Sequence, residues 1–364
     1  MDNKQSQTEY RKWFLTFFVT AAILILVFAG ATIILDPYFH YHKPLPGFGY
    51  LMELSKERYI NDGIVKNYEY DAMITGSSMT ECFSTTVCDE TFGTTSVKVP
   101  LSGGSYKEVD RQVQAALNAN DNIRIVIRGL DGIRYFNDKD ACDYDENSLP
   151  HYLYDNNPFN DAEYVLNKRI FVTDVWDVVG MTRMHKPSTT FDEYANWDPY
   201  YLFGKEGVSS YYGRDSVIPA ETQGVITDEE YEIIRENVAY NIEQAIKDNP
   251  DVEFYYFFTP YSIYYWDYMQ RLGELDRQVE AERYIASLLV GYDNLHLYSF
   301  YGQYDFVSNL DNYKDTHHYG GVGSNQIIEW LNEGVGEITA ENLDSYYDQI
   351  WEYYTNYDYD ALFE

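Results

Sequence analysis

Two short motifs, far apart in this chain, contain the residue types needed for nucleophilic chemistry. Gly76-Ser77-Ser78 ends the apolar run that follows Asp71, and Asp315-Thr316-His317-His318 places an acid three residues before a histidine. A serine hydroxyl becomes a nucleophile when a neutral imidazole accepts its proton, and an acid on the other ring nitrogen orients that imidazole. Of the seven histidines, only His318 has an aspartate at this offset together with a following helix pattern. The pair of motifs therefore indicates a serine, His318 and Asp315 acting together.

Each motif also has a simpler interpretation. The two serines could only cap the helix that follows them, which serine does well. Asp315, His317 and His318 could ligate a metal, but adjacent histidines point in different directions and no third convergent acid is identifiable, so we predict neither a metal nor a cofactor. His296 lies in an apolar strand pattern and is interpreted as a core histidine.

The elements that must position these motifs alternate between strand and helix. Apolar runs of strand length end at a polar or glycine-rich turn, and amphipathic helical patterns separate them. The expected strands end at Gly76 or span 94–101, 123–127, 252–258 and 295–300, and the expected helices span 105–118, 227–249, 265–289 and 320–332. This pattern predicts an α/β fold, a three-layer sandwich with a central parallel sheet, and ligands of such sheets bind beyond the carboxyl ends of the strands.

These motifs resemble those of the SGNH, or GDSL-like, hydrolase superfamily, including its membrane-anchored bacterial cell-envelope branch. The resemblance implies the SGNH/flavodoxin-like form of this fold and assigns the nucleophile to Ser78, the acid to Asp315 and the base to His318. The family's second block supplies a glycine whose N–H binds the oxyanion together with that of the nucleophile, Ser78. That block corresponds here to Leu101-Ser102-Gly103-Gly104-Ser105, where Gly103 is the better match and Gly104 the alternative.

The third family block departs from the pattern. The family has Gly-x-Asn-Asp, in which the Asn side chain donates to the oxyanion, whereas this chain has Arg128-Gly129-Leu130-Asp131. An ionised aspartate cannot donate a hydrogen bond, and loss of one oxyanion donor lowers rates by about a hundred- to a thousandfold. Either Arg128 replaces the missing donor electrostatically, or the chain is a binding protein that kept the fold.

The N-terminus carries the features of a membrane anchor. Residues 14–35 contain no charge, and as a helix they reach about 33 Å, enough for a bilayer core of about 30 Å. Three basic and two acidic residues precede them, which predicts a cytoplasmic N-terminus and an extracytoplasmic main domain. Ala29-Gly30-Ala31 also resembles a cleavage site, so a removed signal peptide is the alternative.

The predicted organisation follows from these boundaries. We expect a cytoplasmic tail at 1–13, a single-pass transmembrane anchor at 14–35, a juxtamembrane lead-in at 36–67, the α/β domain at 68–338 with an insertion at 132–225, and an acidic aromatic tail at 339–364. The insertion is rich in aromatic residues, and insertions at the functional edge of a sheet shape access to it. Its tyrosine and tryptophan rings could stack on sugars, with the candidates Tyr152, Tyr154, Trp176, Trp197, Tyr200 and Tyr201.

Charge and cysteine content exclude some functions. With 59 acidic and 26 basic residues the formal net charge is −33, which excludes nucleic-acid binding. The three cysteines cannot all pair within one chain, and outside the cytoplasm one disulfide and one free thiol is possible. The resemblance implies a serine esterase or O-acyltransferase acting on an acylated polysaccharide or teichoic-acid-like polymer of the envelope. The alternative is a catalytically inactive glycan-binding or envelope-assembly protein.

Overall fold

The structure is a computed structural model that describes residues 2–145, 148–155 and 157–363. Met1 of the predicted cytoplasmic tail, residues 146, 147 and 156 of the predicted insertion and Glu364 of the predicted C-terminal tail lie outside the described residues. The chain forms two compact units, each assembled from separate stretches of sequence. Unit 1 comprises 1–52, 58–67 and 150–189, and unit 2 comprises 53–57, 68–149 and 190–364.

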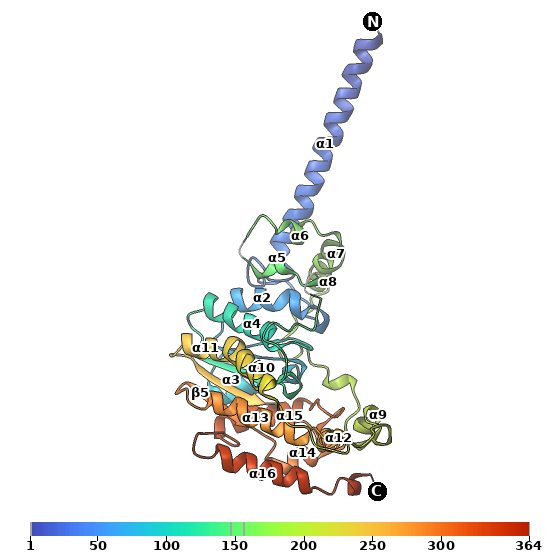
Figure 1. The fold of residues 1–364 in the computed structure, drawn as a ribbon. Coiled ribbons are helices and arrows are strands. Elements are labelled where there is room, and N and C mark those ends of the chain that lie inside the picture. The colour runs from blue at the N-terminus through green and yellow to red at the C-terminus, as the bar shows by residue number, and fades with distance from the viewer. Residues whose placement is uncertain (1, 146–147, 156, 364) are drawn as a thin grey trace. The chain divides into compact units, whose positions relative to one another are not determined.

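Unit 1 carries the apolar N-terminal helix α1, Asp2–Leu35. Within α1, Gln7–Leu35 is long and apolar enough to cross a membrane, although a signal sequence near an N-terminus has the same features. Figure 1 shows α1 extending as a single helix beyond the short helices of its own unit. Near its end α1 is partly packed: Thr32 is buried, and the Phe28 ring stacks on Phe171 at 4.1 Å.

The end of α1 is fixed by the buried carboxylate of Asp36. Asp36 has φ +40°, and its side chain accepts the backbone N–H groups of His40, Tyr41 and His42 at 2.7–3.0 Å. The Tyr164 hydroxyl donates to the same carboxylate at 2.8 Å. The predicted lead-in and the middle of the predicted insertion therefore build unit 1 together. Its other helices are α2 (Glu57–Asn67), α5 (His151–Tyr154), α6 (Ala162–Val165), α7 (Lys168–Ile170), the π-helical η5 (Phe171–Val175) and α8 (Trp176–Arg183).

Unit 2 is built on a parallel five-stranded sheet, which confirms the predicted α/β class. The strand order is β2-β1-β3-β4-β5, and every named pair is parallel. One antiparallel bridge, Tyr298 to Glu337, adds to the edge strand. The strands are β1 (Ala72–Gly76), β2 (Ser96–Pro100), β3 (Ile125–Leu130), β4 (Glu253–Phe258) and β5 (Leu295–Ser299).

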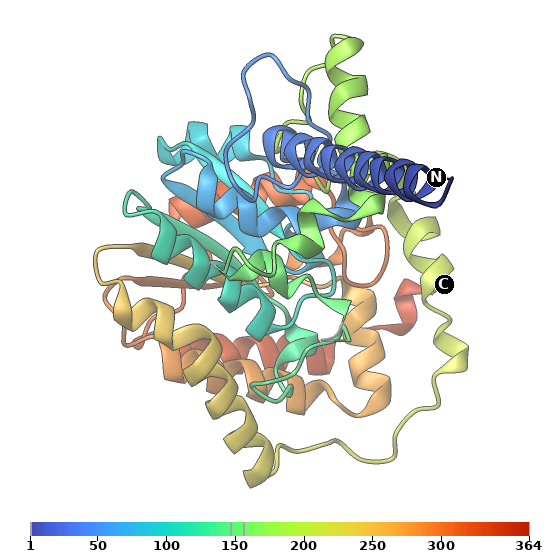
Figure 2. The same cartoon turned by 90° about the horizontal axis from the view of Figure 1, so that it is seen from above.

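The strand order determines which helices share a face of the sheet. The chain moves from β1 to β2 in one direction and from β2 through β3 and β4 to β5 in the other, so right-handed crossovers place the connecting helices on opposite faces. Helices α3 (Thr85–Phe92) and α15 (Gly321–Glu333) contact each other, and the opposite layer contains α4 (Tyr106–Ala119), α10 (Asp228–Val238), the π-helical η8 (Ala239–Glu243), α11 (Gln244–Asp248) and α13 (Leu275–Leu289). Figure 2 shows helices on both sides of these strands.

The C-terminal tail and several short elements complete unit 2. Helix α16 (Leu343–Asn356), in the segment predicted as an acidic aromatic tail, packs on α13. The segment before α10 runs as an extended loop (Figure 2). The remaining helices are η1 (Leu54–Lys56), η2 (Ser78–Thr80), η3 (Gly132–Arg134), η6 (Asp198–Tyr200), α9 (Gly204–Tyr211), η7 (Arg214–Ser216), α12 (Ile263–Leu272), α14 (Tyr304–Ser308), η9 (Leu310–Asn312) and η10 (Asp360–Leu362).

One predicted helix is wrong. The expected single helix over 265–289 is two helices, α12 and α13. Gly273 ends α12 with φ +71°, a left-handed conformation that glycine adopts without a steric penalty. An added Cβ there would lie 2.4 Å from the Thr222 carbonyl oxygen, so the close approach of the 222 loop also requires glycine.

Candidate active site

The serine pair lies where β1 ends, between β2 and β3. Gly76 has φ +151°, and an added Cβ would lie 2.8 Å from the Thr80 methyl group, so glycine permits the sharp exit from the strand. The Ser77 side chain accepts the Met79 N–H at 3.3 Å and caps η2. Ser77 therefore has the capping role that we considered for both serines. Ser78 is left with its hydroxyl on the other side of the turn.

The Ser78 hydroxyl meets the imidazole of His318. The Ser78 Oγ to His318 Nε2 distance is 2.8 Å, and His318 Nδ1 lies 2.8 Å from Asp315 Oδ2. Because Asp315 accepts at Nδ1, the tautomer with the proton on Nδ1 leaves Nε2 free to accept the serine proton. The structure thus brings together the three residues predicted as nucleophile, base and acid.

A tight turn holds Asp315 beside His318. Asp315 Oδ1 accepts the backbone N–H groups of His317 and His318 at 2.8 Å each. The Lys314 N–H donates to the His318 carbonyl at 3.0 Å, and Tyr313 and Tyr319 form an antiparallel bridge. Burial alone would raise the pKa of Asp315, but its hydrogen bonds to His318 and the nearby main-chain N–H groups lower it well below the usual range. Asp315 is therefore ionised when it orients His318.

The neighbouring His317 has a different environment. Its Nδ1 lies 2.9 Å from the Thr316 hydroxyl, and its ring packs against Tyr261 and Tyr265. Burial lowers the pKa of His317, so this imidazole is neutral at physiological pH. The centres of the two histidine rings are 6.4 Å apart, and the ring planes are inclined at 65° to each other.

The predicted oxyanion glycine lies in a turn after β2. The N–H of Gly104 donates to the Leu101 carbonyl at 2.7 Å, which commits Gly104 to that turn. Gly103 has φ +63°, and an added Cβ would meet nothing within 4 Å, so its own surface faces open space. This geometry favours Gly103 over Gly104 as the donor that would act with the Ser78 N–H.

Asp131, at the position of the family's missing asparagine, acts as a buried acceptor. The hydroxyls of Ser77 and Tyr261 donate to opposite oxygens of this carboxylate, and Thr259 Oγ1 lies 3.3 Å from the Tyr261-bound oxygen. Asp131 is buried, and the carboxylate joins the ends of β1, β3 and β4. It supports the turn that presents Ser78 rather than supplying an oxyanion donor.

The structure places Arg128 away from the predicted oxyanion role. Its guanidinium is fully buried and donates to the carbonyls of Asn241 at 2.8 Å and Tyr106 at 3.1 Å. Asp110 lies 3.8 Å from it, and the rings of Tyr106 and Tyr256 flank it. The strand period explains the error: Arg128 pairs with Thr75 in register and projects into the helix layer that contains α4 and η8.

Two buried ionisable residues, Glu81 and Lys98, lie near the catalytic residues. Sequence patterns predict neither of them. Lys98 on β2 is fully buried, and its ammonium donates to the Glu81 carbonyl at 2.5 Å. Burial raises the pKa of Glu81 to about 7, while the charges of His318 and Lys314 act in the opposite direction. Burial lowers the pKa of Lys98 to about 8. The sequence pattern of β2 does not predict that the Lys98 side chain points into the protein.

The second half of the predicted insertion borders the catalytic residues. The Trp197 ring stands perpendicular to the His318 ring, with 5.8 Å between ring centres. Trp197 is only 5% exposed, so its predicted role as a sugar-stacking surface is wrong. Tyr200 is 83% exposed and Tyr201 is 44% exposed, so these rings remain available at the rim.

Other predicted features lie elsewhere. His296 is half-buried rather than a core residue, and its two ring nitrogens lie 3.1 Å from Glu253 and Glu337. The disulfide that the sequence allows is not formed, and Cys82, Cys88 and Cys142 are reduced. Burial raises the pKa of Cys82 to about 12 and that of Cys88 to about 11, so both are protonated at neutral pH.

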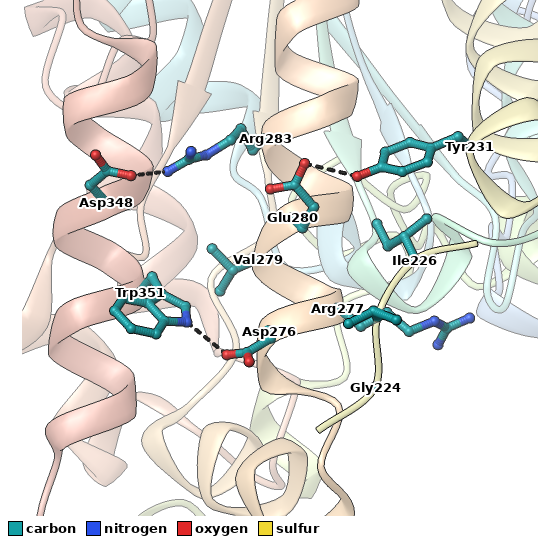
Figure 3. Close-up of a pocket in the computed structure, with 11 residues that line it drawn as sticks. Gly224, Ile226, Tyr231, Asp276, Arg277, Val279, Glu280, Arg283, Asp348 and Trp351 are labelled. Atoms are coloured by element: carbon teal, nitrogen blue, oxygen red, sulfur yellow. Dashed lines mark hydrogen bonds and ion pairs between the residues drawn. The ribbon is translucent and has the colours of Figure 1, made fainter. Parts of the chain in front are cut away.

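A cavity of about 380 Å³ lies among α10, α13 and α16 (Figure 3). The Trp351 indole N–H donates to Asp276 at 2.7 Å, the Tyr231 hydroxyl donates to Glu280 at 3.0 Å, and Arg283 pairs with Asp348. Among the described residues that line it there is no serine, cysteine or histidine. The paired groups of this wall stabilise the contact between α13 and α16, and the nucleophile with its base lies at Ser78.

Comparison with known proteins adds little. The sequence matches no protein-family model and no curated protein. One solved structure to which it is similar is described as a candidate platelet activating factor from Streptococcus pneumonia. The two chains are 12% identical, the match covers 78% of this chain and 92% of that chain, and the TM-score is 0.38. At this level the similarity carries no information about activity.

Proposed function

We propose that this protein is a serine ester hydrolase or O-acyltransferase of the SGNH type. The observation that carries the proposal is the continuous hydrogen-bonded relay from the Ser78 hydroxyl through His318 to Asp315. The parallel strand order and the position of Ser78 at the end of β1 fit the resemblance to that superfamily. Because a fold alone does not imply a function, the proposal is based on the hydrogen-bonded relay.

The chain's own residues supply each proton transfer of such a reaction. His318 Nε2 takes the proton as Ser78 Oγ bonds to the ester carbonyl carbon, and the N–H groups of Ser78 and Gly103 hold the oxyanion. The C–O bond to the alcohol then breaks, and His318 returns the proton to that oxygen, which leaves an acyl-serine. Water or a sugar hydroxyl attacks next, giving its proton to His318, and Ser78 leaves with that proton.

The proposed setting is extracytoplasmic, with α1 as the membrane anchor. The basic residues before the apolar segment favour a cytoplasmic N-terminus. The substrate class is an acylated polysaccharide or teichoic-acid-like polymer of the envelope, as the resemblance implies. The exposed ring of Tyr200, near the Trp197 that touches His318, would lie along such a polymer.

A second candidate is a catalytically inactive glycan-binding or envelope-assembly protein. The observation that favours it is Asp131, because a carboxylate committed to Ser77 and Tyr261 cannot donate to an oxyanion. Loss of one of three donors slows an esterase by about a hundred- to a thousandfold but leaves the nucleophile activated. The two candidates therefore differ in whether Ser78 reacts covalently.

Labelling of the detergent-solubilised full chain with a fluorophosphonate probe separates them. The wild-type protein is expected to be labelled, Ser78→Ala is expected to be unlabelled, and Ser287→Ala, which changes an exposed serine on α13, is expected to label as the wild type does. Folded wild-type protein that remains unlabelled would instead favour the inactive binder.

A further inference from the structure

Lys314 precedes the catalytic acid, and its ammonium lies in a box of aromatic rings. Nζ is 4.1 Å from the centre of the Trp197 ring and 3.9 Å from that of Tyr201. Asp315 Oδ2 is 3.9 Å from the same nitrogen. Lys314 is buried, and a buried ammonium is costly unless nearby groups compensate for its lost hydration. Two π faces and one carboxylate provide that compensation.

The walls of this box also touch the catalytic histidine. The Trp197 indole that covers Lys314 is the ring that stands perpendicular to His318 at 5.8 Å. Among the residues that the structure describes, the Trp197 Nε1 is buried without a hydrogen-bond partner, so this ring is held by packing. Farther along the insertion, the Gly204 N–H donates to the Tyr313 carbonyl at 3.1 Å. Residues 197–204 are thus fastened at both ends to the turn that carries Asp315 and His318.

We propose that Lys314 is a positioning residue of the Ser78–His318–Asp315 relay. Its ammonium, clamped between Trp197 and Tyr201, keeps the insertion against His318 and holds the Asp315 carboxylate in line with Nδ1. Lys314 touches neither Ser78 nor a reacting atom. It acts through the geometry and the charge around His318. The importance of Lys314 for turnover rests on the proposed esterase or acyltransferase function. The effect of Lys314 on His318 does not depend on that function.

The effect of losing Lys314 follows from the contacts around the relay. Replacing the ammonium by an apolar group of similar length removes the cation that faces Trp197, Tyr201 and the Asp315 carboxylate. Trp197 and Tyr201 then lose the group around which they close, and the Trp197 ring is no longer held beside His318.

The test uses Lys314→Met and Lys314→Arg in the full chain in detergent. Histidine labelled with ¹³C at Cε1 gives one signal for each of seven histidines, and the His318→Gln spectrum identifies that of His318. Lys314→Met is expected to shift the His318 signal, because the Trp197 ring changes its position beside the imidazole. In the fluorophosphonate reaction it is expected to lower the labelling rate about tenfold. Lys314→Arg keeps the charge and is expected to restore most of both properties.

Two further variants make the result decisive. Lys205→Met removes an exposed lysine from α9 and is expected to change neither the His318 signal nor the rate. Tyr201→Leu opens one wall of the box at a partly exposed position, and we expect a smaller shift of the His318 signal with about threefold slower labelling, even if Lys314→Met fails to fold. An unchanged His318 signal in folded Lys314→Met, or in Tyr201→Leu if only that variant folds, overturns the inference. Wild-type protein that is unlabelled refutes the proposed function, and the His318 signal still decides the role of Lys314.

Discussion

The Ser78 hydroxyl lies 2.8 Å from Nε2 of His318, although 240 positions separate the two residues in the chain. The sheet explains this contact. Ser78 follows β1, whose neighbours are β2 and β3, and the loop with His318 follows β5 and precedes α15. In a parallel sheet all strands end at the same edge, so both segments reach that edge.

The first prediction concerns the base and the acid of the relay. His318→Gln is expected to lower the rate of fluorophosphonate labelling by at least about a thousandfold, because Ser78 loses its proton acceptor. Asp315→Asn is expected to cost at least about a hundredfold, since an amide no longer stabilises the imidazolium. Labelling rates of purified variants measure this. His296→Gln is the matched control, and a similar loss there would indicate a general effect of removing a histidine.

The second prediction concerns Asp131. Because its carboxylate accepts hydrogen bonds from Ser77 and Tyr261 in a buried position, Asp131→Asn is expected to destabilise the protein by about 1–3 kcal/mol. It is not expected to increase labelling, even though it restores the family's residue type. Urea unfolding and labelling rates test both parts, with the exposed Asp140→Asn as control. Faster labelling of Asp131→Asn would show that position 131 reaches the oxyanion after all.

The third prediction concerns pH and the buried carboxyl of Glu282. Tyr135 and Ser299 donate to it at 2.7 Å each, and burial raises its pKa from 4.5 to about 7. Below pH 4.5 the carboxyl is protonated in both states and its contribution to stability is complete. As the pH rises through about 7 the folded state must bury a charge, and that contribution is lost.

Glu282→Gln should remove this pH dependence. Between pH 5 and 8 the wild-type protein is expected to lose up to about 3 kcal/mol of unfolding free energy relative to Glu282→Gln, as a shift of one pKa unit corresponds to about 1.4 kcal/mol. Thermal melting across this range measures the difference. Parallel curves for the two proteins would contradict the prediction. Glu280→Gln, two residues earlier on α13 at a partly exposed position, is the control.

The fourth prediction concerns the thiols. Cys82 and Cys88 are buried and their pKa values are about 12 and 11, so they are protonated at pH 8. In the folded protein a thiol reagent is expected to modify only the partly exposed Cys142 quickly, and all three after unfolding. Mass spectrometry after partial modification measures how much of each cysteine has reacted. A rapid reaction at Cys82 would show that the region next to Ser78 opens.

The fifth prediction concerns the rim of the site. Tyr200 is 83% exposed, so Tyr200→Ala should leave stability unchanged. If a polysaccharide lies across this ring, the variant is expected to raise KM for an O-acetylated polysaccharide about five- to twentyfold, which corresponds to about 1–2 kcal/mol, and to leave hydrolysis of p-nitrophenyl acetate unchanged. Tyr211→Ala, another exposed tyrosine of the insertion, is the comparison. An equal change for both esters would argue against a polymer-specific role.

The local part of the site could be predicted from the sequence. Gly76-Ser77-Ser78 and Asp315-Thr316-His317-His318 are each a single turn, and their hydrogen bonds depend on residues two or three positions apart. The order of strands and helices was also predictable, because periodicity distinguishes a buried strand such as β1 from an amphipathic helix such as α4.

The other parts of the fold and of the site depend on contacts between residues far apart in the chain, which local sequence patterns do not predict. Arg128 was expected near the oxyanion, and only the alternation of side chains along β3 decides that it points into the helix layer. The surroundings of Lys314 require the insertion to return to the catalytic turn. The break at Gly273 was missed because the apolar pattern continues through both helices, and the loop at Thr222 that requires a glycine lies about fifty residues earlier.

The interleaving of the two units bears on how a soluble form of this protein should be made. The chain passes between the units five times, and residues 36–52 and 58–67 belong to the same unit as 150–189. A version that starts at residue 68 would leave 150–189 without the segments that bury its Tyr164, which donates to Asp36. Cutting just before Asp36 removes α1 while keeping that carboxylate, although Phe171 then loses the ring that stacks on it. Replacing Phe171 with a polar residue should compensate for the apolar surface left by the cut.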